Sequence, residues 1–201
     1  MKKSRWKRYN EKSGLWIASS KPVFGYWFRF LKHAHKDRPD DVDWSLYEEW
    51  GGKDYILRTN QTDWWKSKWK TLFGYKEGEE DKILYPLLHK KNHADGIRFA
   101  LMVYEIKKEN EANGVDISNW EIAKEIVRRE QSKRNARGRA DPSFDPSKWQ
   151  FHIARYGVDE KMMKEDPEAF RKKKRILQSH IGRYMRKADE HLENVCKGQF
   201  P

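Results

Sequence analysis

The segment from Asp166 to Gly198 constrains the fold of this chain most, because it combines helix-boundary signals with one regular apolar stripe. Asp166 and Pro167 suit the N-cap and first position of a helix, and Gly198 suits a left-handed C-cap. Between them the apolar residues recur at steps of three, four or seven: Phe170, Leu177, Ile181, Tyr184, Ala188, Leu192 and Val195. This spacing predicts one long helix with a single face directed at a core.

The remaining faces of this expected helix are strongly basic, and no acidic residue lies between Glu168 and Asp189. The whole chain carries a formal net charge of +12 over 201 residues. Such an excess favours a polyanionic partner, and DNA is the partner we predict, with RNA as the alternative and no membrane. The residues of this helix that we expect to contact nucleic acid are Arg171, Lys172, Lys174, Arg175, Arg183 and Arg186.

A second basic stretch follows an expected helix that starts at Asp116 or Ser118 and directs Ile122 and Ile126 inward. Two Asp-Pro steps come soon afterwards and indicate an ordered turn region. We therefore expect residues 133–139 to form an exposed basic loop that holds phosphates. The candidate nucleic-acid contacts of this region are Arg128, Arg129, Lys133, Arg134, Arg137 and Arg139.

The rest of the chain predicts further helices, many of them rich in aromatic residues that we assign to a core. They cover residues 22–34, 44–50 capped by Asp43, 64–73 capped by Thr62 or Asp63, 82–93 broken near Pro86, 97–113 and 147–156. Only residues 55–60 favour a strand. The sequence predicts a mainly α fold, a compact multi-helix domain of about eight helices with at most one short strand and a long basic C-terminal helix.

Residues 1–13 are expected to be a basic flexible arm, and residues 14–201 a single helical domain with a possible sub-division near residues 76–81. A single cysteine, Cys196, excludes an internal disulfide and fits a reducing compartment, where it would serve as a small packing residue. No apolar run approaches the length of a membrane span. These features predict a cytoplasmic protein.

Two short stretches resemble DNA-binding motifs. A strand at residues 56–61 followed by two helices is the order of the ribbon-helix-helix fold, with Arg58, Asn60 or Gln61 as base readers. Residues 118–125 resemble the first helix of a helix-turn-helix. The glycine-containing turn of that motif does not follow, because the helical pattern continues to Glu130.

A third pattern concerns catalysis. Asp95, Glu105 and Lys107 resemble the spaced Asp and Glu-x-Lys of the PD-(D/E)xK nuclease core, whose two acids hold a divalent metal. That resemblance requires a strand over residues 97–107, where the polar continuation to Asn113-Gly114 favours a helix. His89 and His93 are expected to be surface histidines, so we predict no metal site, no cofactor and no enzymatic activity.

The layout as a whole is similar to uncharacterised proteins of proteobacterial integrative and conjugative elements. The matching residues are Trp64-Trp65, Trp69, Leu72-Phe73, Arg183 to Ala188, Asn194-Val195 and Gly198 to Pro201. The resemblance implies a mobile genetic element as the setting, with conjugation as its context. It implies no activity and no catalytic residues.

The first functional expectation is a DNA-binding transcriptional regulator of a mobile element, without enzymatic activity and acting as a homodimer. It would dock electrostatically through the basic helix and the 133–139 segment. One alternative is a non-enzymatic interaction subunit of a larger assembly, in which the amphipathic C-terminal helix binds a partner protein. The other alternative is the metal-dependent nuclease built on Asp95, Glu105 and Lys107.

Overall fold

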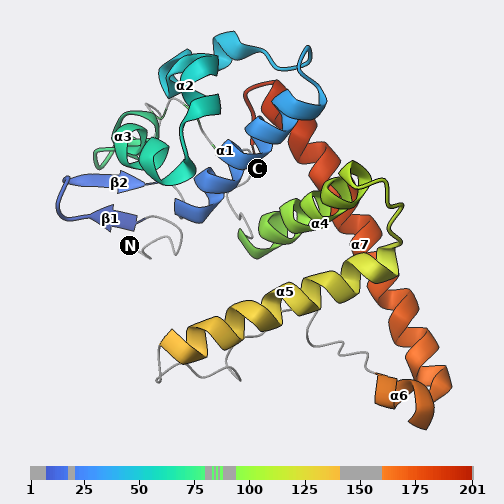
Figure 1. Ribbon diagram of the computed structural model, residues 1–201. Helices are drawn as coiled ribbons and strands as arrows, with labels where there is room; N and C mark the ends of the chain where they lie inside the picture. The colour runs from blue at the N-terminus through green and yellow to red at the C-terminus, as the bar shows by residue number, and fades with distance from the viewer. Residues whose placement is uncertain are drawn as a thin grey trace. The chain divides into compact units, whose positions relative to one another are not determined.

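The computed structural model describes residues 8–17, 21–79, 83, 85, 87, 94–140 and 160–200 (Figure 1). The chain divides into two compact units. Unit 1 comprises residues 1–101 and 187–201, and unit 2 comprises residues 102–186. The single domain over residues 14–201 stays a prediction.

The described part of the chain contains eight helices, so the predicted mainly α fold is confirmed. None of these helices combines the length and apolar character that a bilayer span requires. The elements are β1 (Arg8–Asn10), β2 (Leu15–Ile17), α1 (Lys21–Asp37), η1 (Trp44–Trp50), α2 (Gly52–Arg58), α3 (Gln61–Phe73), β3 (Gly74–Tyr75), α4 (Ala94–Ala112), α5 (Asn119–Ala140), α6 (Glu160–Glu165) and α7 (Pro167–Cys196).

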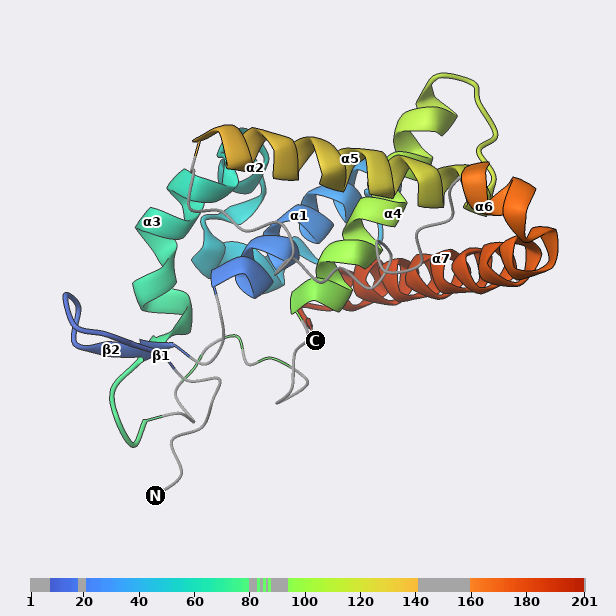
Figure 2. The same ribbon diagram turned by 90° about the horizontal axis from the view of Figure 1, so that it is seen from below.

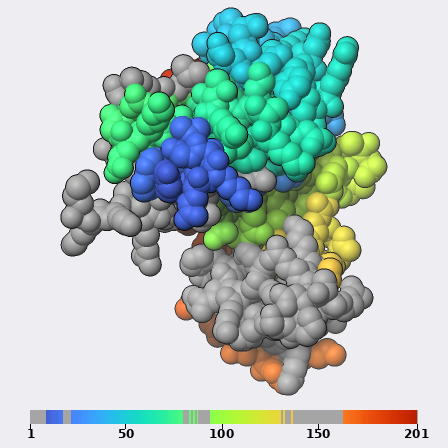
Figure 3. All heavy atoms as spheres, turned by 90° about the vertical axis from the view of Figure 1, so that its left-hand side faces the viewer, coloured from blue at the N-terminus to red at the C-terminus, as the bar shows by residue number. Residues whose placement is uncertain are grey.

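Unit 1 contains a small antiparallel sheet of order β1-β2-β3, where at most one strand was expected. Tyr9 pairs with Trp16, and Trp16 also pairs with Tyr75. Gly14 allows the tight connection between β1 and β2, because its φ of 69° is accessible mainly to glycine. Figure 3 shows this hairpin in dark blue at the surface, beside the teal and green atoms of α3 and β3. Part of the predicted flexible arm is therefore strand β1.

The core of unit 1 is built from aromatic rings, as the sequence predicts. The Trp50 ring lies 5.2 Å from that of Trp27 and 4.6 Å from that of Trp64, and all three side chains are fully buried. Figures 1 and 2 show α1 running beside α2 and α3, which supply much of this core. Tyr47 joins three elements, since it accepts a hydrogen bond from Trp27 Nε1 (3.0 Å) and donates one to the Val195 carbonyl (2.6 Å).

The strand predicted over residues 55–60 is wrong, because this stretch forms helix α2 and the turn that follows. The side chain of Lys32 on α1 stabilises the C-terminal end of α2. Its ammonium group donates to the carbonyls of Leu57 (3.0 Å) and Thr59 (2.8 Å), which have no partner within the helix. The ribbon-helix-helix interpretation needs a strand here, so the structure removes its basis.

Several helix boundaries follow the sequence signals closely. Asp43 caps η1, and its side chain accepts a hydrogen bond from the Ser45 N–H. Helix α3 starts at Gln61, three residues earlier than expected, because its cap is Asn60 rather than Thr62 or Asp63. Helix α4 confirms the helix predicted from residue 97 onward.

Two other expectations fall mainly or wholly outside the described residues. In the predicted helix over 82–93 only Ile83, Tyr85 and Leu87 are described, and none of the three is helical. The predicted helix over 147–156 lies entirely outside the description, as do His89 and His93.

We expect Phe200→Ala to lower the free energy of unfolding by about 3–5 kcal/mol, as deletion of a buried aromatic ring does. The Phe200 side chain is fully buried in unit 1, stacked 5.4 Å from the Trp27 ring. The measurement is urea unfolding monitored by tryptophan fluorescence. Gln199→Ala is the matched control, because the neighbouring Gln199 is exposed. Equal unfolding midpoints for the two variants would contradict the packing of Phe200.

Candidate nucleic-acid interface

Helix α7 begins where the sequence predicts, at a local capping structure. The Asp166 side chain accepts a hydrogen bond from the Ala169 N–H at 3.0 Å, and Pro167 occupies the first helical position, where no backbone donor is needed. The helix then continues for 30 residues to Cys196. Gly198 follows in the left-handed conformation, with a φ of 67°, so the predicted stop is confirmed as well.

The part of α7 in unit 2 presents a row of cations on its solvent side. Leu177 and Ile181 are buried, which fixes the rotation of the helix about its axis. Lys172, Arg175, Arg183 and Arg186 are spaced so that they share the opposite side, and Arg171 flanks them. The exposed residues that we call the α7 basic row are Arg171, Lys172, Arg175, Arg183 and Arg186.

The α7 basic row is not neutralised locally. No carboxylate lies on the helix between Glu168 and Asp189, so Arg175 and Arg183 have none within one turn on α7. Glu168 and Asp189 lie one turn from Arg171 and Arg186, but no ion pair joins them among the described residues. Within the described residues none of the five forms an ion pair with another element either. The row is therefore a concentrated source of positive potential.

Lys174, also predicted to contact nucleic acid, points elsewhere. It is half-buried, and its ammonium group lies over the Trp120 ring of α5, 5.3 Å from the ring centroid. The Trp120 ring also meets Phe170 edge-on at 6.0 Å. Lys174 thus helps to pack α5 against α7 through a cation–π contact, and we remove it from the candidate interface.

Helix α5 starts with a capping box formed by Ser118 and Glu121. The Ser118 hydroxyl accepts a hydrogen bond from the Glu121 N–H at 3.3 Å. In return the Glu121 carboxylate accepts from the Ser118 N–H at 3.1 Å. These hydrogen bonds to Ser118 lower the pKa of Glu121. The predicted start at Ser118 is confirmed.

Arg128 and Arg129 project from α5 as expected, but carboxylates of unit 2 already neutralise them. Arg128 donates two hydrogen bonds of 2.7 Å to Glu125. Arg129 donates one hydrogen bond of 2.7 Å to Glu125 and also pairs with Glu109 on α4. This arrangement ties α5 to α4. The pairing within α5 has a sequence signal, since Glu125 precedes the two arginines by three and four positions.

The electrostatic coupling of this cluster is visible in the pKa values. Hydrogen bonds from Arg128 and then Arg129 lower the pKa of Glu125 from 4.5 to about 2, against the opposing effect of desolvation. The pKa of Arg129 is raised, mainly by its hydrogen bond to Glu109. Both arginines are therefore committed to structure, which weakens their assignment to a nucleic-acid interface.

The basic loop predicted over residues 133–139 is wrong, because α5 continues as a helix to Ala140. Lysine, arginine and alanine favour helix, and the single Gly138 near the end does not stop it. The helical backbone carries Lys133, Arg134, Arg137 and Arg139, whose side chains lie outside the description. The unbroken α5 also excludes the turn of a helix-turn-helix after residue 125.

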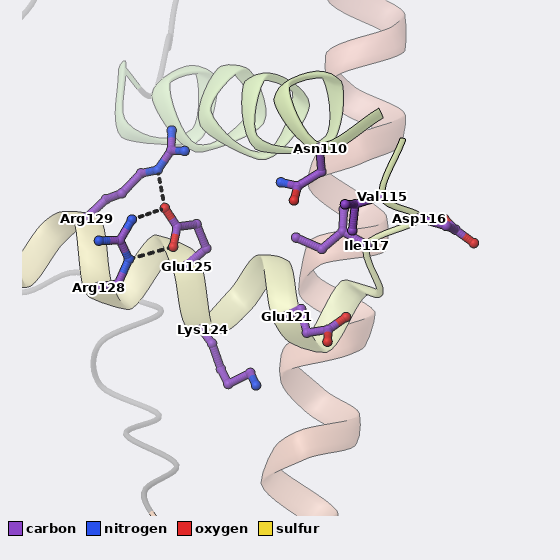
Figure 4. Close-up of a pocket in the computed structure, with 9 residues that line it drawn as sticks. All are labelled: Asn110, Val115, Asp116, Ile117, Glu121, Lys124, Glu125, Arg128 and Arg129. Atoms are coloured by element: carbon purple, nitrogen blue, oxygen red, sulfur yellow. Dashed lines mark hydrogen bonds and ion pairs between the residues drawn. The ribbon is translucent and has the colours of Figure 1, made fainter. Parts of the chain in front are cut away.

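A hollow of about 540 Å³ lies beside the Arg128–Glu125 cluster, where α4 ends and α5 begins (Figure 4). Figure 4 shows Glu125 turned toward the two guanidinium groups and Asp116 pointing away. Three acidic and three basic side chains are present, so the hollow has no charge excess that would attract a polyanion. Its lining consists of Asn110, Val115, Asp116, Ile117, Glu121, Lys124, Glu125, Arg128 and Arg129.

The residues of the nuclease pattern do not form a metal site. Asp95, Glu105 and Lys107 all lie on helix α4, not on strands. Ten helical residues separate the two acids, a rise of about 15 Å, which is too far for both to hold one ion. Among the described residues no group of three metal-binding side chains comes together.

The comparisons with known proteins add no family to these observations. No family model matches the chain, and no curated protein or solved structure does either. The resemblance to proteins of conjugative elements stays a prediction.

We expect Glu125→Gln to reduce the loss of stability on acidification. Glu125 has a lowered pKa in the folded protein, so it stabilises the fold above its ordinary pKa of 4.5. That contribution disappears as the pH falls from 4.5 to about 2. Urea unfolding at a series of pH values should show that unfolding of the variant takes up about one proton fewer in this window.

The matched control for this experiment is Asp116→Asn, which removes an exposed carboxyl group of the same unit. Its acid dependence should follow that of the unsubstituted protein. If Glu125→Gln and Asp116→Asn gave the same pH profile, the ion pairs of Glu125 would not contribute to stability.

Proposed function

We propose that this protein binds DNA without catalysing a reaction, and that the α7 basic row contacts the phosphate backbone. The observation that carries the proposal is the set of exposed cations on one side of α7 with no ion-pair partner among the described residues. Phosphate contacts of this kind dominate the affinity of proteins for nucleic acid.

The contrast with other basic residues of unit 2 argues against an ordinary solvated surface. Lys107 and Lys108 on α4 both pair with Glu111 one turn away. Arg128 and Arg129 on α5 pair with Glu125. The basic residues of α4 and of the first half of α5 thus have a carboxylate within one helical turn, whereas Arg175 and Arg183 on α7 have none. An unbalanced row costs self-repulsion, which a bound polyanion would relieve.

The biological role that we propose for this activity is transcriptional regulation in a mobile genetic element, by a cytoplasmic homodimer. The mobile-element setting rests on the sequence resemblance described above, and regulation by a cytoplasmic homodimer is what we expect of a basic DNA-binding protein in that setting. A protein whose contacts are mainly to phosphates still needs a few polar side chains at base edges to select an operator. Selection of sequences from a random duplex pool tests for such an operator.

The main test is the salt dependence of binding to a labelled duplex. If all five cations of the α7 basic row contact phosphates, affinity should fall about 500-fold between 50 and 200 mM salt, a logarithmic slope of about −4.5. Arg175→Gln combined with Arg183→Gln should reduce the slope to about −2.7, because each phosphate contact contributes about −0.9.

The control is Lys66→Gln combined with Lys70→Gln, which removes the same charge from the exposed side of α3. It should leave the slope unchanged. Equal effects of the two double variants would assign binding to net charge rather than to α7. No binding at low salt would end the DNA proposal and would favour an acidic protein as the partner of the row.

A further inference from the structure

The α7 basic row falls into two clusters with an uncharged interval between them. Arg171, Lys172 and Arg175 form the first cluster, and Arg183 and Arg186 form the second. Residues 176–182 contain no lysine, arginine, aspartate or glutamate. The eight residues from Arg175 to Arg183 rise about 12 Å along the helix axis.

Between the two clusters, the side of the helix that carries the cations exposes one short side chain. Ser179 lies four residues after Arg175 and four before Arg183, so it occupies the same side of the helix. Its side chain is exposed and short. A ligand bound to both clusters could therefore approach the helix closely at Ser179.

This spacing matches the geometry of one kind of nucleic acid. The major groove of B-form DNA is about 12 Å wide and admits an α-helix, and phosphates line both of its walls. We infer that α7 recognises B-form duplex DNA by crossing the major groove, with one cation cluster on each wall and Ser179 over the base edges. This inference rests on the proposed function and names its substrate.

Other nucleic acids lack this match. The major groove of an A-form RNA duplex is too deep and narrow for side chains to read. A single strand is flexible and adapts to cations at any spacing, so it responds to charge rather than to the distance between clusters. The groove-crossing geometry therefore predicts that duplex DNA binds more tightly than duplex RNA of the same sequence.

The decisive variant exchanges two exposed residues of α7, Ser179→Arg together with Arg183→Ser. Composition, length and net charge stay the same, but one cation moves from the second cluster into the interval. We expect affinity for a 20-base-pair DNA duplex to fall about tenfold or more, because a charge-assisted contact to one wall is lost. Affinity for a single-stranded oligothymidylate of the same length should stay within about twofold.

The controls separate this inference from the proposed function. Equal helicity of the two proteins by circular dichroism checks the fold. If the exchange left duplex affinity unchanged, or lowered duplex and single-strand affinity alike, the groove-crossing geometry would be wrong while DNA binding stood. If the unsubstituted protein bound duplex RNA as tightly as duplex DNA, the inference would also fail. If it bound no nucleic acid, the proposed function itself would be overturned.

Discussion

Burial of one face of α7 is the constraint on which the functional surface depends. A helix with one apolar stripe can rotate very little about its axis, because Leu177 and Ile181 would otherwise meet water. Every cation between Glu168 and Asp189 is then assigned to a fixed side by its position in the sequence. The positive surface is therefore a consequence of hydrophobic packing, and it needs no dedicated loop or ligand to hold it in place.

Charge in unit 2 follows two different patterns. On α4 Glu111 forms ion pairs with two lysines, and on α5 Glu125 forms ion pairs with two arginines. These ion pairs contribute to local structure. The Arg129 guanidinium extends this pattern by joining α5 to α4 through Glu109. The five cations of the α7 basic row form no ion pair within the part of the chain that the structure describes. The difference lies in the sequence, which places a glutamate three or four positions from Lys107 and Arg128 but no carboxylate within one turn of Arg175 and Arg183.

The sequence predicted those features that depend on residues close in the chain. The Asp166 and Asp43 caps, the Gly198 stop and the amphipathic stripe of α7 are all of this kind. The prediction from the sequence was wrong where a residue far away in the chain stabilises the element. The carbonyl groups at the C-terminal end of α2 accept hydrogen bonds from Lys32, which lies on another helix. The contact between Lys174 and Trp120 is equally non-local. The prediction of a loop at residues 133–139 was wrong for a different reason. Basic residues are common in exposed loops, but lysine and arginine also favour helix.

The aromatic core of unit 1 has a consequence for experiments. Its rings lie 4.0 Å to 6.5 Å apart, as between Phe24 and Phe73 or between Trp27 and Phe73, and they are held in fixed mutual orientations. Rings this close shift each other's proton resonances and couple their near-ultraviolet transitions. Unit 1 therefore carries an intrinsic spectroscopic reporter, and its integrity can be followed in the same sample that is being titrated through α7.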